Sequence, residues 1–248
     1  MLNKRRRVGL MVPATNTTFE ADFALVAPKE VTLHSHRLWM SGDVEGEDFI
    51  DKVNEGIEAA AKYLALAKVE VIAYGFTTGS FYRGIAYSKQ LEERIQKAAG
   101  VPGVTPATAI VDALHYFEAK KVSVATPYPE WNNAMLLRYL DEAGFDVLNL
   151  EGDPRPASVA IREPMWDQEP ESIVEFAAKV CLPEADALLC PCTAWRVLEV
   201  VEELEQRLGI PVVTANQTAI WATFRKLGIF QPIHGFGRLL ESLSPAKM

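Results

Sequence analysis

The fold of this chain is decided by the stretch Ala187-Leu188-Leu189-Cys190-Pro191-Cys192-Thr193-Ala194-Trp195. Its first part is an unbroken apolar run, which is typical of a strand buried in a parallel sheet. The run ends in a thiol and a hydroxyl, and apolar residues at helical spacing follow at positions 197, 198, 201, 204 and 208. Ligands bind at such strand-to-helix corners in open α/β sheets. The pattern therefore predicts a site at Cys192, with the start of the next helix lowering the pKa of its thiol.

The composition is that of an ordinary globular protein. The chain has 248 residues, 49% hydrophobic and 23% charged, enough for one large domain or two small ones. A net charge of −8 argues against a nucleic-acid partner, because phosphate binding needs a basic surface. No stretch reaches the ~20 apolar residues of a membrane span, and no signal peptide is apparent. Three cysteines make no disulfide framework, so we expect a cytoplasmic protein without a membrane partner.

Short apolar runs alternate with helical patterns along the whole chain. Strands are expected at residues 8–13, 31–38, 69–74, 101–104, 122–125, 147–150, 187–190 and 210–213. A long helix is expected from about residue 50 to 67. Thr17 or Thr18 is expected to cap the helix that follows the first strand. Such alternation predicts parallel sheets with right-handed crossovers.

The chain also contains an internal repeat. The matching segments are residues 8–13 with 122–127, 71–77 with 187–193, and 100–105 with 209–214. The repeat predicts an α/β fold of two similar lobes, each a parallel sheet flanked by helices, related by a pseudo-two-fold axis. The active site is expected in the cleft between the lobes, with Phe76 and Cys192 at equivalent places on opposite walls.

The repeat also sets the expected domain boundaries. The first lobe is expected to span residues 1–119 and the second lobe residues 120–227. The C-terminal residues 228–248 are expected to return to the first lobe.

Three segments resemble a known group of enzymes. They are Thr77-Thr78-Gly79-Ser80-Phe81-Tyr82-Arg83-Gly84, Ala125-Thr126-Pro127-Tyr128 and Cys192-Thr193. The resemblance is to the aspartate/glutamate racemase superfamily and, within it, to the arylmalonate decarboxylase and maleate cis-trans isomerase group. It runs over nearly the whole chain and implies a cofactor-free reaction on a small dicarboxylic acid.

Cysteine usage separates the members of that superfamily. Racemases use two cysteines, one on each lobe, and the maleate isomerases resemble them in keeping both. The decarboxylases retain only the cysteine of the second lobe. In this chain Cys192 is similar to the second-lobe thiol, whereas Phe76 stands at the first-lobe position. The departure argues against two-thiol racemisation and against the isomerase.

The resemblance implies a role for each matching residue. Cys192 is expected to be the catalytic proton donor, and Thr77, Thr78 and Tyr128 resemble the hydroxyls that bind the substrate's carboxylate. The remaining residues expected to bind substrate are Asn16, Phe76 and Thr193. Met40, Val44 and Phe49 are expected to line an apolar pocket.

Simpler interpretations stand beside these roles. Cys192 could be an inert buried cysteine, the threonines and Ser80 helix caps, Asn16 a turn residue and Phe76 a core aromatic. Cys190 and the tryptophans at positions 131, 166 and 195 are expected in the core. Cys190 and Cys192 with His34 and His36 form no strong zinc signature, so no metal is expected.

We therefore expect decarboxylation of a 2-substituted malonate, with an enediolate intermediate protonated by Cys192. The alternatives are an isomerase of maleate-like diacids, or a racemase-like one, and a small-acid binding protein without chemistry. The sequence carries no signal for an oligomeric state.

Overall fold

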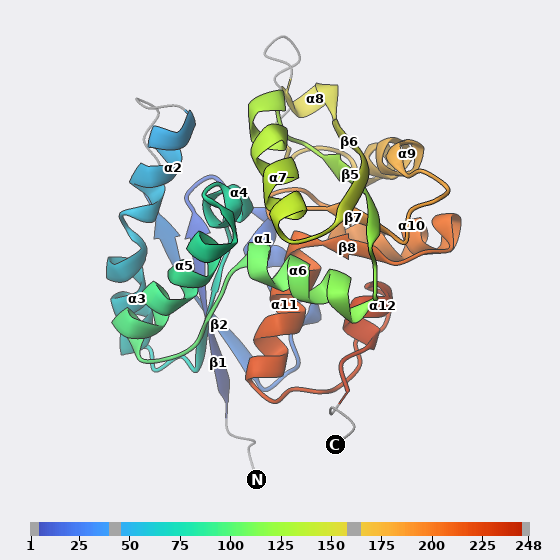
Figure 1. Cartoon of the computed structure of the whole chain (residues 1–248). Helices are drawn as coiled ribbons and strands as arrows, with labels where there is room; N and C mark the ends of the chain where they lie inside the picture. The colour runs from blue at the N-terminus through green and yellow to red at the C-terminus, as the bar shows by residue number, and fades with distance from the viewer. Residues whose placement is uncertain (1–4, 40–45, 158–164, 245–248) are drawn as a thin grey trace.

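The computed structural model describes residues 5–39, 46–157 and 165–244. Within these ranges the chain forms two four-stranded parallel sheets, placed side by side in Figure 1. The first has the order β2-β1-β3-β4, with β1 (Arg6–Pro13), β2 (Val31–Leu38), β3 (Val71–Tyr74) and β4 (Gly103–Val104). The second has the order β6-β5-β7-β8, with β5 (Lys121–Thr126), β6 (Asp146–Gly152), β7 (Ala187–Cys190) and β8 (Val212–Thr214). The expected two-lobed α/β fold is confirmed.

Helices flank both sheets (Figure 1). They are α1 (Thr18–Val26), α2 (Gly46–Asn54), α3 (Ile57–Leu66), α4 (Thr77–Phe81), α5 (Gly84–Ala99), α6 (Pro106–Tyr116), α7 (Glu130–Glu142), α8 (Pro154–Ala157), α9 (Pro170–Val180), α10 (Val201–Leu208), α11 (Ala215–Lys226) and α12 (Gly237–Glu241), with a 3-10 helix η1 (Leu198–Val200). None of the helices in the described ranges is long and apolar enough to span a bilayer.

The strand pairing confirms the register of the repeat. Val8 of β1 pairs with Val71 of β3, and Val122 of β5 pairs with Ala187 of β7. The next pair of strands keeps the same offset: Ile72 pairs with Gly103 and Leu188 with Val212. β3 and β7 are therefore equivalent, and both are buried along their whole length. The second residue after each strand is Phe76 in one lobe and Cys192 in the other.

The two sheets share helices, which holds the lobes together. α11, from the end of the second series, packs against α6 of the first series and contacts β3 and β4 of the first sheet. The helices begin in the same way, because Thr105 accepts a hydrogen bond from the Thr108 N–H and Thr214 accepts one from the Gln217 N–H. All strands of the first sheet come before residue 119 and all strands of the second sheet come after residue 120, and we propose the lobe boundary between these two residues.

The end of the chain packs against the elements that precede it. α12 was expected to return to the first lobe, but its main contacts are with α10, α11 and β8. Side chains of the second half hold it there: Glu205 accepts a hydrogen bond from the Arg238 N–H at 2.8 Å, and the Gln217 amide donates one to the Phe236 carbonyl at 2.8 Å. α12 is therefore tied to α10 and α11, and the assignment of residues 228–248 to the first lobe stays a prediction.

The expected long helix is divided into α2 and α3. The carbonyl of Asn54 accepts a hydrogen bond from the Arg94 guanidinium at 2.9 Å instead of continuing the helical ladder. Its side chain turns inward and donates to the Gly79 carbonyl at 2.9 Å. The break thus anchors α2 to the turn that begins at the end of β3.

Candidate active site

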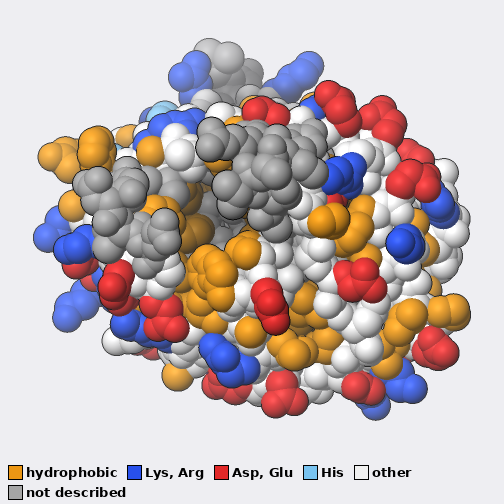
Figure 2. All heavy atoms as spheres, turned by 90° about the horizontal axis from the view of Figure 1, so that it is seen from above, with side chains coloured by type: hydrophobic (Ala, Val, Ile, Leu, Met, Phe, Trp, Pro, Cys, Tyr) orange, Lys and Arg blue, Asp and Glu red, His pale blue; other side chains and the backbone are white. Residues whose placement is uncertain are grey.

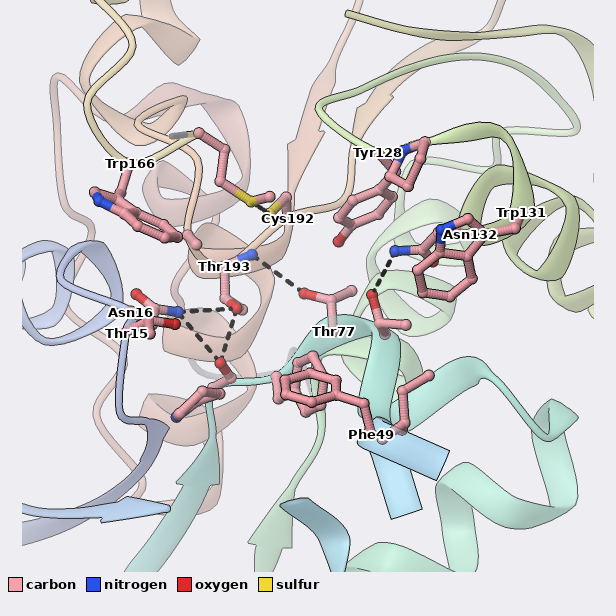
Figure 3. Close-up of a pocket in the computed structure, with 18 of the residues that line it drawn as sticks. Thr15, Asn16, Phe49, Thr77, Tyr128, Trp131, Asn132, Trp166, Cys192 and Thr193 are labelled. Atoms are coloured by element: carbon pink, nitrogen blue, oxygen red, sulfur yellow. Dashed lines mark hydrogen bonds between the residues drawn. The ribbon is translucent and has the colours of Figure 1, made fainter. Parts of the chain in front are cut away.

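A cavity of about 720 Å³ lies at the carboxyl ends of the central strands of both sheets (Figure 3). Its lining comes from the segments that follow β1, β3, β5 and β7, from α2, and from the residues just before α9. The lining residues are Pro13, Thr15, Asn16, Gly46, Phe49, Ile50, Gly75, Phe76, Thr77, Thr78, Tyr128, Pro129, Trp131, Asn132, Met165, Trp166, Cys192, Thr193 and Ala194. The structure therefore brings all seven expected site residues together in one cleft. Met40 and Val44 lie outside the described residues.

Cys192 lies on the second-lobe wall and is 5% exposed. Burial raises the pKa of its thiol to about 11, against the opposing effect of the Ala194 N–H, the Tyr128 hydroxyl and the Trp195 N–H. The expectation of a lowered pKa is wrong, because a turn and η1 follow Cys192 and α10 begins only at Val201. The thiol is therefore neutral near pH 7, which suits a proton donor better than a nucleophile.

Thr77 and Thr78 begin α4, yet neither hydroxyl caps it. The Thr77 Oγ1 accepts a hydrogen bond from the Thr193 N–H at 3.2 Å, and the Thr78 Oγ1 accepts one from the Asn132 amide at 2.9 Å (Figure 3). Because each oxygen is already bound from the protein side, its hydrogen is directed away from that donor. Both hydroxyls lie near the Tyr128 hydroxyl, so the two threonines present donors at one point of the cleft.

Tyr128 is buried, and its hydroxyl donates to the carbonyl of Pro191, the residue before Cys192. Burial raises the pKa of Tyr128 well above its ordinary value, with a further contribution from the neighbouring Cys192. The phenol therefore stays neutral and fixes the backbone that carries the thiol. A direct bond from Tyr128 to a carboxylate remains a prediction and requires its hydroxyl to turn from Pro191 towards the ligand.

Asn16 and Thr193 join the two lobes across the floor of the cleft (Figure 3). The Asn16 side chain donates to the Gly75 carbonyl at 3.3 Å and to the Thr193 hydroxyl at 3.2 Å. The Thr193 hydroxyl in turn donates to the Gly75 carbonyl at 2.8 Å. The Asn16 Oδ1 accepts the backbone N–H groups of residues 18 and 19, each at 3.0 Å. Asn16 therefore caps α1, in place of the expected Thr17 or Thr18.

Aromatic rings form much of the remaining wall. Phe76 packs edge-on against Phe49, with ring centroids 6.5 Å apart, and against Tyr74 at 6.3 Å. Trp131 and Trp166 were expected in the core, but both line the cavity. Trp131 stands in the first turn of α7 and is 47% exposed. Trp195 is in the core as expected, and Cys190 is fully buried.

The cavity holds no positive side chain among the described residues that line it. A carboxylate there would be bound by neutral donors beside an apolar surface, and hydrophobic side chains gather beside the hollow on the face seen in Figure 2. Nor do three metal-ligating side chains come together anywhere in the described ranges. The residues that sequence reasoning did not assign to the site include Thr15, Trp131, Asn132, Met165 and Trp166, because none of them stands in a motif with a distinctive spacing.

The sequence and the structure are both similar to those of known proteins. The family model of arylmalonate decarboxylase matches residues 8–240. The maleate isomerase of Pseudomonas putida (strain KT2440) is 29% identical over 95% of this chain and 97% of that protein. The arylmalonate decarboxylase of Bordetella bronchiseptica is 27% identical over 94% of this chain and 96% of that protein. A solved structure of a Nocardia farcinica maleate cis-trans isomerase mutant has a TM-score of 0.86 at 26% identity and covers 95% of this chain and 98% of that one. That mutant has a cysteine replaced by serine and a covalently bound succinylcysteine intermediate.

Proposed function

This chain belongs to the arylmalonate decarboxylase family, and from this membership we propose that it decarboxylates a malonate carrying a large apolar group at carbon 2, without a cofactor. The observation that carries the proposal is the pairing of one neutral thiol, Cys192, with an aromatic ring, Phe76, at the equivalent position across the cleft. The three relatives reported above are named as maleate isomerases or as an arylmalonate decarboxylase, so their similarity supports an enzyme that acts on a small dicarboxylic acid.

One carboxylate of the substrate binds to the hydroxyls of Thr77 and Thr78, with Tyr128 beside them. These donors are held in place from behind by the Thr193 N–H and the Asn132 amide. Decarboxylation places a second negative charge on this retained carboxylate as it becomes an enediolate. Donors already fixed in position stabilise that growing charge more than they stabilise the ground state.

The other carboxylate lies against the apolar wall formed by Phe49, Phe76, Met165 and the two tryptophans of the cavity. A charged carboxylate is poorly solvated in such surroundings, whereas neutral CO2 is not penalised there. The bond between carbon 2 and this carboxylate breaks, its electron pair passes into the enediolate, and CO2 leaves. The same wall accommodates the apolar substituent of carbon 2.

Cys192 then transfers its proton to carbon 2. The thiol is neutral near pH 7, and the thiolate formed by the transfer accepts hydrogen bonds from the Ala194 and Trp195 N–H groups and from Tyr128. A proton from water restores the thiol for the next turnover. Because Phe76 has no proton to give from the opposite side, protonation occurs on one face and yields one enantiomer.

A second candidate is isomerisation of a maleate-like diacid, which the similarity to maleate isomerases and the position of Asn16 favour. In the Nocardia farcinica relative a succinyl group is bound to a cysteine although another cysteine has been replaced. That route uses a nucleophilic thiolate and a second cysteine. Cys192 is the one thiol among the described residues lining this cavity, and its raised pKa keeps it protonated. A binding protein without chemistry is the third candidate.

The proposal is tested by proton NMR in D2O with phenylmalonate, methylmalonate and maleate offered separately. The wild type is compared with Cys192→Ala and with Cys181→Ser, a matched change at a thiol outside the cavity. Loss of CO2 from phenylmalonate, abolished by the first change and kept by the second, is the expected result. Fumarate from maleate would establish the isomerase instead, and turnover of none of the three would contradict both catalytic candidates.

A further inference from the structure

The loop that carries the thiol, residues 191–195 and here named the thiol loop, is held by the opposite lobe. The Thr193 N–H and hydroxyl bind Thr77 and Gly75 of the first lobe. The Ala194 carbonyl accepts a hydrogen bond from the Thr18 hydroxyl of α1 at 3.1 Å. The Thr193 carbonyl accepts one from the Asn216 Nδ2 at 3.1 Å. The position of Cys192 therefore depends on contacts outside its own lobe.

The contact made by Asn216 leads to a buried acid that the proposed reaction does not use. The same Nδ2 donates to the Asp22 Oδ2 at 2.6 Å. Asp22 lies on α1 and is 3% exposed, and Asn216 lies in the first turn of α11 and is 2% exposed. A continuous buried path thus runs from α1, through α11, to the thiol loop.

We propose that Asp22 is a positioning residue for Cys192, acting through the Asn216 amide on the Thr193 carbonyl. Asp22 is not among the residues that line the cavity. Its role is to fix the turn that aims the Ala194 and Trp195 N–H groups at the Cys192 sulfur. The positioning itself is independent of the reaction, and only its effect on turnover rests on the proposed function.

The orientation of the Asn216 amide depends on the charge of Asp22. An ionised carboxylate only accepts hydrogen bonds, so it holds the NH2 side of the amide towards itself, and the second N–H then reaches the Thr193 carbonyl. The Asn216 Oδ1 is buried and has no partner among the described residues. A protonated Asp22 is able to donate to that oxygen if the amide turns over, and the turn removes the bond to Thr193.

The charges around Asp22 make this change relevant at neutral pH. Burial raises the pKa of Asp22 to about 7, with Glu199 raising it further and the Asn216 bond and Arg196 lowering it. Asp22 opens onto a polar groove beside the active site, whose other charged residues are Asp167, Glu169, Arg196 and Glu199. The carboxyl is ionised above about pH 7, so the Asn216 bond to the thiol loop is kept on the alkaline side and is lost as the pH falls.

The direct test measures the rate at which iodoacetamide alkylates Cys192, read from its own peptide by mass spectrometry, from about two units below pH 7 to about two units above. The wild type is expected to show a step near pH 7 on top of the steady rise with thiolate fraction. Asp22→Asn is expected to lack the step and to keep the low-pH behaviour. Turnover of phenylmalonate is expected to change by roughly tenfold across the same step.

Variants of two charged residues near Asp22 are expected to shift the pH of the step in opposite directions. Glu199→Gln removes a charge that raises the pKa of Asp22, so the step moves to lower pH; Arg196→Gln removes one that lowers it, so the step moves to higher pH. Neither residue lines the active-site cavity. The proposal is overturned if the step persists in Asp22→Asn, or if these two variants do not shift it in opposite directions. A step in alkylation without any turnover would leave the positioning role in place and contradict the proposed function alone.

Discussion

The carboxyl ends of β3 and β7 are structurally equivalent positions in the two lobes. Strand register makes Gly75-Phe76-Thr77 equivalent to Pro191-Cys192-Thr193, and both segments line one cavity. One segment presents an aromatic ring and two donor threonines, Thr77 and its neighbour Thr78. The other segment presents the thiol of Cys192, and its threonine, Thr193, donates a hydrogen bond to the carbonyl of Gly75 after β3. The fold thus provides two facing positions, and the sequence places a thiol at only one of them.

The largest expected effect comes from removing the thiol. Cys192→Ala leaves neither wall with a proton donor, and we expect kcat for phenylmalonate to fall by about 10³-fold or more. Cys181→Ser, at a half-buried thiol away from the cavity, is expected to retain the wild-type rate. Steady-state kinetics measure both, and a Cys192→Ala variant with near wild-type kcat would contradict the assignment of the acid.

The second prediction makes the two walls alike. Phe76→Cys places a thiol on each side of carbon 2, so the product is expected to lose and regain its α-hydrogen and to racemise in D2O. Chiral chromatography of the 2-phenylpropionate formed from 2-methyl-2-phenylmalonate, followed over time, measures the change. Phe49→Cys is the matched control, because it adds a thiol to the same cavity away from the symmetric position. Equal racemisation by both variants would contradict the claim that position 76 lies on the opposite face of carbon 2 from Cys192.

Sequence reasoning reached the fold and the residues of the cleft because both depend on local patterns. Buried strands read as apolar runs, the repeat fixed the register, and ligand-binding residues follow strand ends. It failed where the outcome depends on distant contacts. The pKa of Cys192 depends on its burial, and the break between α2 and α3 depends on the contacts of Asn54 with Arg94 and Gly79. Neither leaves a mark in the neighbouring sequence. The cap of α1 was misassigned for a local reason, because Asn16, Thr17 and Thr18 are all residue types that cap helices.

The third prediction compares the equivalent threonines. Thr77→Val removes a donor that faces the retained carboxylate, and kcat is expected to fall by about 10²-fold. Thr193→Val removes a hydroxyl already bound to the Gly75 carbonyl, so its main expected effect is on stability. Kinetics and thermal unfolding of the two variants separate the roles. A larger loss of kcat in Thr193→Val than in Thr77→Val would reverse the assignment.

The smallest expected effect concerns the buried Asp22, which is linked through Asn216 to the thiol loop. The pKa of Asp22 is raised by folding, so the native state binds more protons than the unfolded chain between about pH 4 and pH 7 and loses stability as the pH rises through this range. Asp22→Asn removes this loss. Urea unfolding above pH 7 is expected to find the variant more stable than the wild type by about 2 kcal/mol. No difference in the pH dependence of the two proteins would contradict an ionisable, buried Asp22.

The central claim is that the cleft delivers a proton from one wall only, and the stereochemistry of one reaction tests it most directly. Wild-type enzyme is given 2-methyl-2-phenylmalonate in D2O, and the product is analysed by NMR and chiral chromatography. The account predicts 2-phenylpropionate of a single configuration, with one deuteron at carbon 2 and no further exchange during prolonged incubation. A racemic product would contradict the account, because it requires protonation of carbon 2 from the face opposite Cys192. Continued exchange of the hydrogen at carbon 2 would also contradict it, because exchange requires a base that removes this hydrogen, whereas the account gives Cys192 only the role of an acid.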